Sequence, residues 1–190
     1  MYIFQFLEEW PVSNTLTPLK TQLCPLNLTQ RSFTMAHRQY EEYICVTREI
    51  NAPIADVWGI IAGFGAEKAW YPGCLRLSVE GFGLGSIRTF EYEYPAGEHK
   101  GERYTFSEEM TEVDAANHSM SFRVRRPDYP DMIAYGTTVL DPLGPNQTRF
   151  RWLANGSPLP DEYKAILQKD LNFRFNQLID AIAAVVEPKP

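Results

Sequence analysis

The sequence predicts an α+β fold in which a curved antiparallel sheet of about seven strands surrounds one long C-terminal helix. Seven segments alternate apolar and polar residues with a period of two, which is typical of strands with one buried face. Short turns separate most of these segments, and strands joined by short turns pair antiparallel. The chain then ends in a long stretch whose apolar residues recur with helical spacing.

The first elements lie close together in the chain. A strand rich in β-branched residues is expected over residues 43–50. Two short helices should follow it. The first covers residues 53–62, with Asn51 as its N-cap and Pro53 near its first turn. The second lies within residues 65–73 and ends at Pro72 and Gly73.

The remaining strands and the long helix complete the fold. Six strands are expected over residues 76–80, 86–94, 103–113, 118–126, 133–140 and 148–154. A turn over residues 141–146 divides the last two. The helix should run from about residue 160 to 186, against the concave face of the sheet. Its apolar seam consists of Leu167, Leu171, Phe175, Leu178, Ile182 and Val185.

The chain divides near residue 39. Residues 1–38 contain three prolines and no sustained period of 2 or 3.6, so we expect a loosely ordered N-terminal extension before a folded domain over residues 39–190. Met35 stands just before the first regular element, which leaves a start at that residue as an alternative.

Composition excludes several classes of protein. The chain has 190 residues and a formal net charge of −6, which disfavours binding to nucleic acid or an anionic membrane. No apolar run approaches the roughly 18 residues of a membrane span. The N-terminus lacks the basic region of a signal peptide. Because Cys24, Cys45 and Cys74 are odd in number and lack metal-ligand spacing, we expect no disulfide framework and a cytoplasmic location.

Aromatic residues are abundant, with 11 Phe, 10 Tyr and 4 Trp. They can fill a core or line a cavity, and two expected strands bear on this choice. One face of the first carries Arg88, Phe90 and Tyr92, and one face of the second carries Tyr104, Phe106, Glu108 and Met110. Because both faces bear rings, both should point inward.

A hairpin centred near residue 98 would place Arg88 opposite Glu108, and Phe90 opposite Phe106. A one-residue slip would turn Glu108 to the other face, and the aromatic alternation argues against that slip. An isolated buried charge is costly, so Arg88 and Glu108 should be partners. In an apolar pocket, Arg88 can polarise a carbonyl or hydroxyl and Glu108 can move a proton. A structural salt bridge, or a pair near a wet barrel mouth, is the alternative.

Other candidates carry weaker signals. Tyr135 and Trp152 can orient a ligand or simply pack in the core. Asn172 and Asn176 form an i,i+4 pair on the long helix and can bind a ligand if they border the seam. The candidate lining of the cavity comprises Trp70, Phe90, Tyr92, Tyr104, Phe106, Met110, Phe122, Tyr135, Trp152, Asn172 and Asn176.

No cofactor or metal is expected. The segment Gly81-Phe-Gly-Leu-Gly85 precedes a strand, whereas a dinucleotide fingerprint must open a helix. His99 and His118 lack a matching third ligand, which argues against a metal site.

The stretch from Tyr43 to the end resembles the SRPBCC (START-like, birch-pollen-allergen-like) superfamily, especially its polyketide cyclase/dehydrase branch. The resemblance implies a helix-grip fold. The matching segments, in order, are residues 50–58 (INAPIADVW), 70–72 (WYP), 85–88 (GSIR), 108–114 (EEMTEVD), 118–124 (HSMSFRV), Tyr135 and 149–152 (RFRW).

Two plant groups in this superfamily share finer motifs, Gly-x-x-Arg and Glu-x-x-x-x-x-Asp. In the lachrymatory factor synthases the matching Arg and Glu are taken to be catalytic, which maps onto Arg88 and Glu108. In the abscisic acid receptors the equivalent Glu contributes to the polar network around the ligand. The usual Glu-Arg-Leu is here Glu108-Glu109-Met110, and the receptors' Ser-Gly-Leu-Pro gate loop is absent. Hormone reception is therefore not the expected function.

The leading hypothesis is a cofactor-independent enzyme of secondary metabolism, a lyase or isomerase that binds a hydrophobic small molecule. It would catalyse cyclisation, isomerisation or dehydration, with Glu108 as acid/base and Arg88 holding an oxyanion. The alternative is a non-catalytic carrier of a lipid, sterol or phenolic compound. A receptor that closes on its ligand to bind a partner is a third hypothesis. The protein is expected to be a monomer or a homodimer.

Overall fold

The computed structural model describes residues 40–127 and 129–188. The elements are β1 (Glu41–Ile50), α1 (Ile54–Ile61), the 3-10 helix η2 (Glu67–Ala69), β2 (Cys74–Glu80), β3 (Ile87–Glu93), β4 (Arg103–Asp114), β5 (Ser119–Arg125), β6 (Ala134–Gly144), β7 (Gln147–Gly156) and α2 (Asp161–Val186). The expected extension over residues 1–38 and the alternative start at Met35 lie outside the described residues.

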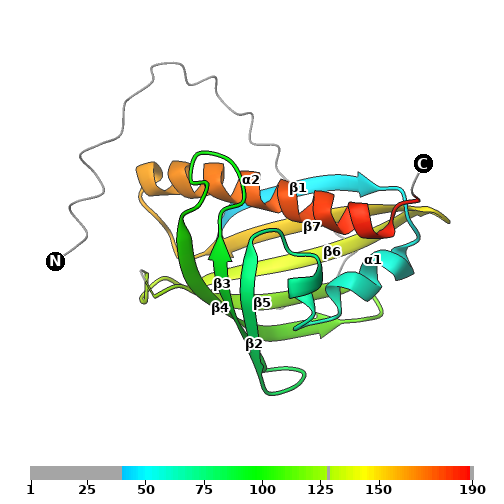
Figure 1. The fold of residues 1–190 in the computed structure, drawn as a ribbon, viewed down its shortest axis with the longest axis horizontal. Coiled ribbons are helices and arrows are strands. Elements are labelled where there is room, and N and C mark those ends of the chain that lie inside the picture. The colour runs from blue at the N-terminus through cyan, green and yellow to red at the C-terminus, as the bar shows by residue number, and fades with distance from the viewer. Residues whose placement is uncertain (1–39, 128, 189–190) are drawn as a thin grey trace, which may run out of the picture.

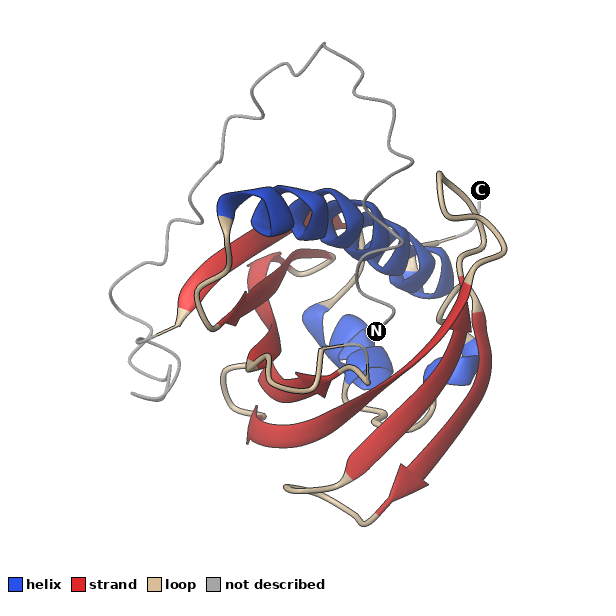
Figure 2. Ribbon diagram, turned by 90° about the vertical axis from the view of Figure 1, so that its left-hand side faces the viewer, coloured by secondary structure: helices blue, strands red, loops and turns tan. Residues whose placement is uncertain are grey.

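The seven strands form one antiparallel sheet in the order β1-β7-β6-β5-β4-β3-β2. The sheet curves, and α2 lies along its concave side, as Figures 1 and 2 show. The two short helices, α1 and η2, both follow β1. The predicted fold class is confirmed, and the space between the sheet and α2 is where a site would form.

The predicted register of the β3–β4 hairpin is confirmed. Arg88 pairs with Glu108, Phe90 with Phe106 and Tyr92 with Tyr104. The Phe90 and Phe106 rings stack with centroids 4.6 Å apart and planes 5° apart. Phe90 is fully buried. Many of the rings therefore form the core, because neighbouring inward positions on adjacent strands bring them into stacking distance.

The turn expected over residues 141–146 is present but shorter than expected. β6 continues to Gly144, so that only Pro145 and Asn146 separate it from β7. The extra length is stabilised because Asp141 forms a salt bridge of 2.8 Å with Arg151 on β7. Pro142 is tolerated because β5 ends its pairing with β6 at Val139, so the missing N–H of the proline leaves no ladder bond unmade on that side.

Two expectations about the helices need correction. Pro53, rather than Asn51, is the N-cap of α1, and no side chain caps this helix. Asn51 is occupied elsewhere, because its backbone N–H and its Nδ2 donate hydrogen bonds of 2.8 and 3.2 Å to Oε1 of Glu187. At the end of α2, Val185 is exposed and Val186 packs against the core in its place.

The cysteines differ from expectation. Cys74 is a free thiol, whereas Cys45 on β1 is disulfide-bonded. The expectation of no disulfide framework is therefore wrong at Cys45. Among the described residues, no helix combines the length and the apolar character needed to cross a membrane.

Gly136 on β6 permits a close approach that supports the site. It pairs with Phe122 on β5, and a Cβ at position 136 would overlap the Phe122 ring.

We predict that Gly136→Ala lowers the free energy of unfolding by about 1–3 kcal/mol, as overpacking of a dense core does. Urea denaturation measures this change. Gly144→Ala is the matched control, because its added Cβ meets open space, and it should stay within about 0.5 kcal/mol of wild type. Equal stability of the two variants would contradict the prediction.

Candidate functional site

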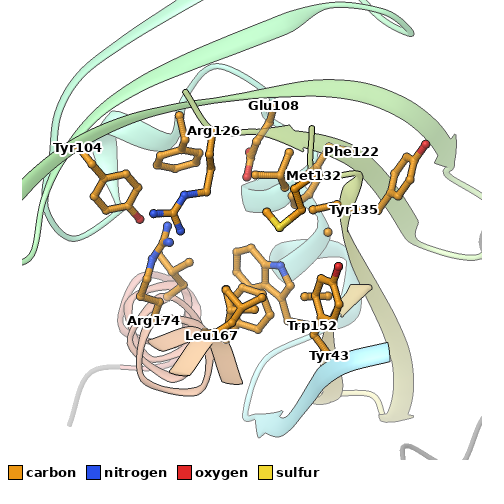
Figure 3. A pocket seen from close by; sticks show the side chains of 18 of the residues that line it. Tyr43, Tyr104, Glu108, Phe122, Arg126, Met132, Tyr135, Trp152, Leu167 and Arg174 are labelled. Atoms are coloured by element: carbon orange, nitrogen blue, oxygen red, sulfur yellow. The ribbon is translucent and has the colours of Figure 1, made fainter. Parts of the chain in front are cut away.

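A cavity of about 70 Å³ lies between the sheet and α2. Six of the predicted residues line it: Tyr104, Phe106, Glu108, Phe122, Tyr135 and Trp152. Figure 3 shows the Glu108 side chain entering from the sheet and Trp152 and Arg174 facing it from the other side. The cavity is smaller than the roughly 300–1,000 Å³ of clefts that hold drug-sized ligands. A larger ligand must therefore displace flexible lining side chains such as Met132.

Seven predicted residues do not line the cavity: Arg88, Trp70, Phe90, Tyr92, Met110, Asn172 and Asn176. Phe90 lies behind Phe106, and the neighbouring Tyr71 lines the cavity where Trp70 was expected. Asn172 is exposed, and Asn176 accepts a hydrogen bond of 2.9 Å from Nη1 of Arg48. The two asparagines therefore lie toward the outer side of α2, beside β1.

Arg88 and Glu108 form a buried ion pair with a third member. Nε and Nη2 of Arg88 lie 2.6 and 2.5 Å from Oε2 of Glu108, and Nη1 donates to Oε1 of Glu67 in η2. All three side chains are at least nine-tenths buried. One guanidinium thus serves two carboxylates, and we name these three residues the buried acidic triad.

Aromatic rings enclose the cation of the triad. The guanidinium carbon of Arg88 lies 4.3, 5.3 and 5.1 Å from the ring centroids of Phe64, Phe90 and Phe122. Such contacts favour a desolvated cation. Arg88 does not line the cavity, and its donors are directed to the two carboxylates of the triad.

Glu108 is the member of the triad that reaches the cavity. Burial raises the pKa of Glu108 above its usual range; the charge of Arg88 opposes this rise, and the charge of Glu67 adds to it. Both Arg88 contacts use Oε2, and no described residue hydrogen-bonds Oε1. This carboxyl group is placed to exchange a proton with a molecule in the cavity, and its raised pKa favours the protonated form more than in an ordinary glutamate.

A second polar group lies across the cavity on α2. Arg174 is 9% exposed, and its Nη2 donates a hydrogen bond of 3.1 Å to the Tyr71 hydroxyl. Burial raises the pKa of Tyr71, so its hydroxyl keeps its proton and can donate it in a hydrogen bond. The Tyr104 hydroxyl and the Trp152 indole N–H are buried and without a partner among the described residues. These groups can orient a polar part of a ligand.

Sequence reasoning missed Glu67, Tyr71, Arg126 and Arg174. Arg174 carried a usable signal, because it lies three residues after Leu171 and four before Leu178, within the apolar seam of the helix. Glu67 and Tyr71 lie in and after a short 3-10 helix, where no periodic pattern assigns a buried face. Among the described residues, no group of three or more His, Cys, Asp or Glu could hold a metal ion.

Comparison with known proteins gives one family and several similar folds. Residues 44–187 match the family described as polyketide cyclase/dehydrase and lipid transport. The chain resembles the crystal structure of the Zhui aromatase/cyclase from Streptomyces sp. R1128, with a TM-score of 0.62 and 15% identity, covering 76% of this chain and 92% of that one.

Two plant proteins share the fold. Norcoclaurine synthase from Thalictrum flavum, in complex with dopamine and hydroxybenzaldehyde, has a TM-score of 0.61 and 19% identity, covering 85% of this chain and 95% of that one. The ginseng major latex-like protein 151 from Panax ginseng has a TM-score of 0.60 and 14% identity, covering 78% and 99%. A search of curated proteins gave no match.

Proposed function

Because this chain belongs to the polyketide cyclase/dehydrase and lipid-transport family, we propose that it binds a hydrophobic small molecule between the sheet and α2 and transfers a proton to or from it. The reaction is a cyclisation, isomerisation or dehydration that needs no cofactor. Glu108 is the acid/base. The bound molecule belongs to the polyketide or terpenoid type of secondary metabolite.

The observation that carries this proposal is the position of Glu108. Among the described residues that line the cavity, Glu108 is the one that carries a carboxylate. Burial raises its pKa toward the range in which acid/base catalysis is efficient. Arg88 acts as a positioning residue, because it holds Oε2 of Glu108 by two contacts and leaves Oε1 toward the cavity. Tyr71 and Arg174, which lie in the lining, take over the oxygen-binding role first expected of Arg88.

A carrier without chemistry is the second candidate. The family description includes lipid transport, and most lining side chains are apolar or aromatic. A carrier uses the same cavity and releases its ligand unchanged.

Binding in the cavity is tested by filling it. Ala134 on β6 is 7% exposed and lines the cavity, so Ala134→Leu places three more carbon atoms there. We expect this variant to bind trans-cinnamamide, a small neutral aromatic amide, at least about tenfold more weakly. The added carbon atoms occupy space that the ligand would fill, and the contacts the ligand then loses should be worth more than about 1.4 kcal/mol. Isothermal titration calorimetry measures the affinity.

The matched control is Ala184→Leu on the exposed side of α2. This variant should bind cinnamamide as the wild type does. If Ala134→Leu melts normally and binds cinnamamide unchanged, ligands do not enter this cavity.

Proton transfer distinguishes the enzyme from the carrier. The probe is 4-phenylbutan-2-one, a hydrophobic ketone whose α-hydrogens exchange slowly with D₂O. An enzyme with an acid/base in its cavity accelerates this exchange, which mass spectrometry follows, and a carrier leaves it at the buffer rate. An unchanged rate with saturable binding of the ketone would favour the carrier.

A further inference from the structure

We infer that the ligand of this cavity carries a carboxylate, and that Arg174 and Arg126 bind it beside Tyr104. This inference rests on the proposed function, because it names the chemical class of the molecule that the cavity takes. It follows from a second concentration of charge, separate from the buried acidic triad.

Arg174 is a buried cation with spare donor capacity. Its guanidinium carbon lies 5.1, 5.2 and 5.3 Å from the ring centroids of Tyr92, Tyr104 and Phe106. Its Nε is buried and has no hydrogen-bond partner among the described residues. A buried N–H group that makes no hydrogen bond costs free energy, so a bound acceptor would stabilise this arrangement.

Asp170 forms an ion pair with Arg174 but accepts no hydrogen bond from it. Oδ2 of Asp170 lies 3.8 Å from Nη1 of Arg174, which is beyond hydrogen-bond distance. Oδ1 of Asp170 accepts a hydrogen bond of 2.7 Å from the Tyr94 hydroxyl. Glu108 is held by Arg88. Arg174 therefore keeps charged donors for a molecule in the cavity.

Arg126 brings a second cation to the same place. It follows β5, is half-buried and lines the cavity. Its guanidinium carbon lies 5.2 Å from the Tyr104 centroid, the same distance as that of Arg174. The two carbons are thus at most twice that distance apart, and Figure 3 shows the two guanidinium groups pointing toward one another beside Tyr104.

This arrangement suits a carboxylate. A carboxylate between the two guanidinium groups is attracted by both positive charges. A guanidinium binds a carboxylate through two parallel hydrogen bonds, and the unpartnered Tyr104 hydroxyl adds a third donor. The apolar body of the ligand then lies along Phe122 and Trp152, next to Glu108.

The test compares two probes of nearly equal shape, trans-cinnamate and trans-cinnamamide, which differ in charge. We expect the wild type to bind cinnamate at least about tenfold more tightly in isothermal titration calorimetry. Arg174→Gln should weaken cinnamate by about tenfold or more and cinnamamide by less than about threefold, because only the anion loses a charged partner. Arg126→Gln should shift the same ratio in the same direction, and it keeps the test valid if Arg174→Gln fails to fold.

Arg125→Gln is the control, because Arg125 is paired with Glu109 on the outer side of the sheet. It should leave both affinities unchanged. Equal wild-type affinity for the two probes, or an equal loss for both in the Arg126 and Arg174 variants, would overturn the carboxylate inference and leave the cavity function standing. If neither probe binds to the wild type, both the cavity function and this inference fail.

Discussion

Glu108→Gln is expected to lower the rate of α-hydrogen exchange of 4-phenylbutan-2-one by about 10²–10⁴-fold, the usual contribution of a positioned acid/base. Glutamine keeps the shape of the side chain and its acceptor toward Arg88, but it cannot take up or release the proton. Affinity for the ketone should change little, because the apolar lining is unaltered.

The variant should remain folded, because folding raises the pKa of Glu108 and the ionised carboxylate is therefore less favourable in the folded chain than in the unfolded chain. The pKa of Glu108 is higher in the folded chain than in the unfolded chain, mainly because the side chain is buried. Its contribution to stability is therefore full below its unfolded pKa of about 4.3 and is lost as the pH rises through the folded pKa. Glutamine does not titrate, so the variant should be at least as stable as the wild type near pH 7.

The same shift predicts the pH profile of the wild type. Abstraction of a proton needs ionised Glu108, so the exchange rate should rise with pH at a midpoint above that of an ordinary glutamate. Glu91→Gln, on the exposed face of β3, is the control and should keep both the rate and the profile. Full turnover in a folded Glu108→Gln protein would rule out the acid/base role and leave the carrier.

Arg88→Met is expected to lower the free energy of unfolding by about 3–5 kcal/mol at neutral pH, because it leaves Glu67 and Glu108 buried without their cation. For a chain of this length each kcal/mol shifts the melting temperature by roughly 2–4 °C. The loss should shrink as the pH falls, because Glu108, whose pKa is raised by burial, can then take up a proton. Urea denaturation at several pH values measures both effects.

A triple variant tests the cause. Glu67→Gln and Glu108→Gln added to Arg88→Met remove the unpaired charges, and most of the stability should return. Arg76→Met is the control, since its ion pair with Glu91 is largely exposed and should be worth less than about 1 kcal/mol. A stable Arg88→Met protein, or a triple variant no better than the single one, would show that the buried acidic triad does not stabilise the fold.

The features that could be predicted from the sequence are those that follow from a regular spacing of apolar residues along a strand or a helix. The alternation of rings on two strands was sufficient to place Arg88 opposite Glu108, because a slip of one residue would have turned every ring outward. The long helix and its seam followed from the same kind of regularity. Pro142 was assigned to a turn because a proline inside a strand is rare. Its position beyond the end of β5, which makes it acceptable in β6, depends on tertiary structure that the local sequence does not show.

The rest of the site depended on contacts between distant segments. Glu67 joins Arg88 across 21 residues of sequence, and Tyr71 meets Arg174 across 103. Neither separation has a local signature. Arg88 was expected to face the ligand because it alternates with rings, but η2 supplied a second carboxylate and enclosed it.

The order of the strands has a consequence for how the chain is made. β1 pairs with β7, and Glu41 meets Gly156, more than a hundred residues later. At a synthesis rate of about 5–20 residues per second, β1 leaves the ribosome on the order of ten seconds before its partner exists. β1 therefore cannot complete its pairing until β7 has emerged, and a sheet closed by such distant strands should fold slowly.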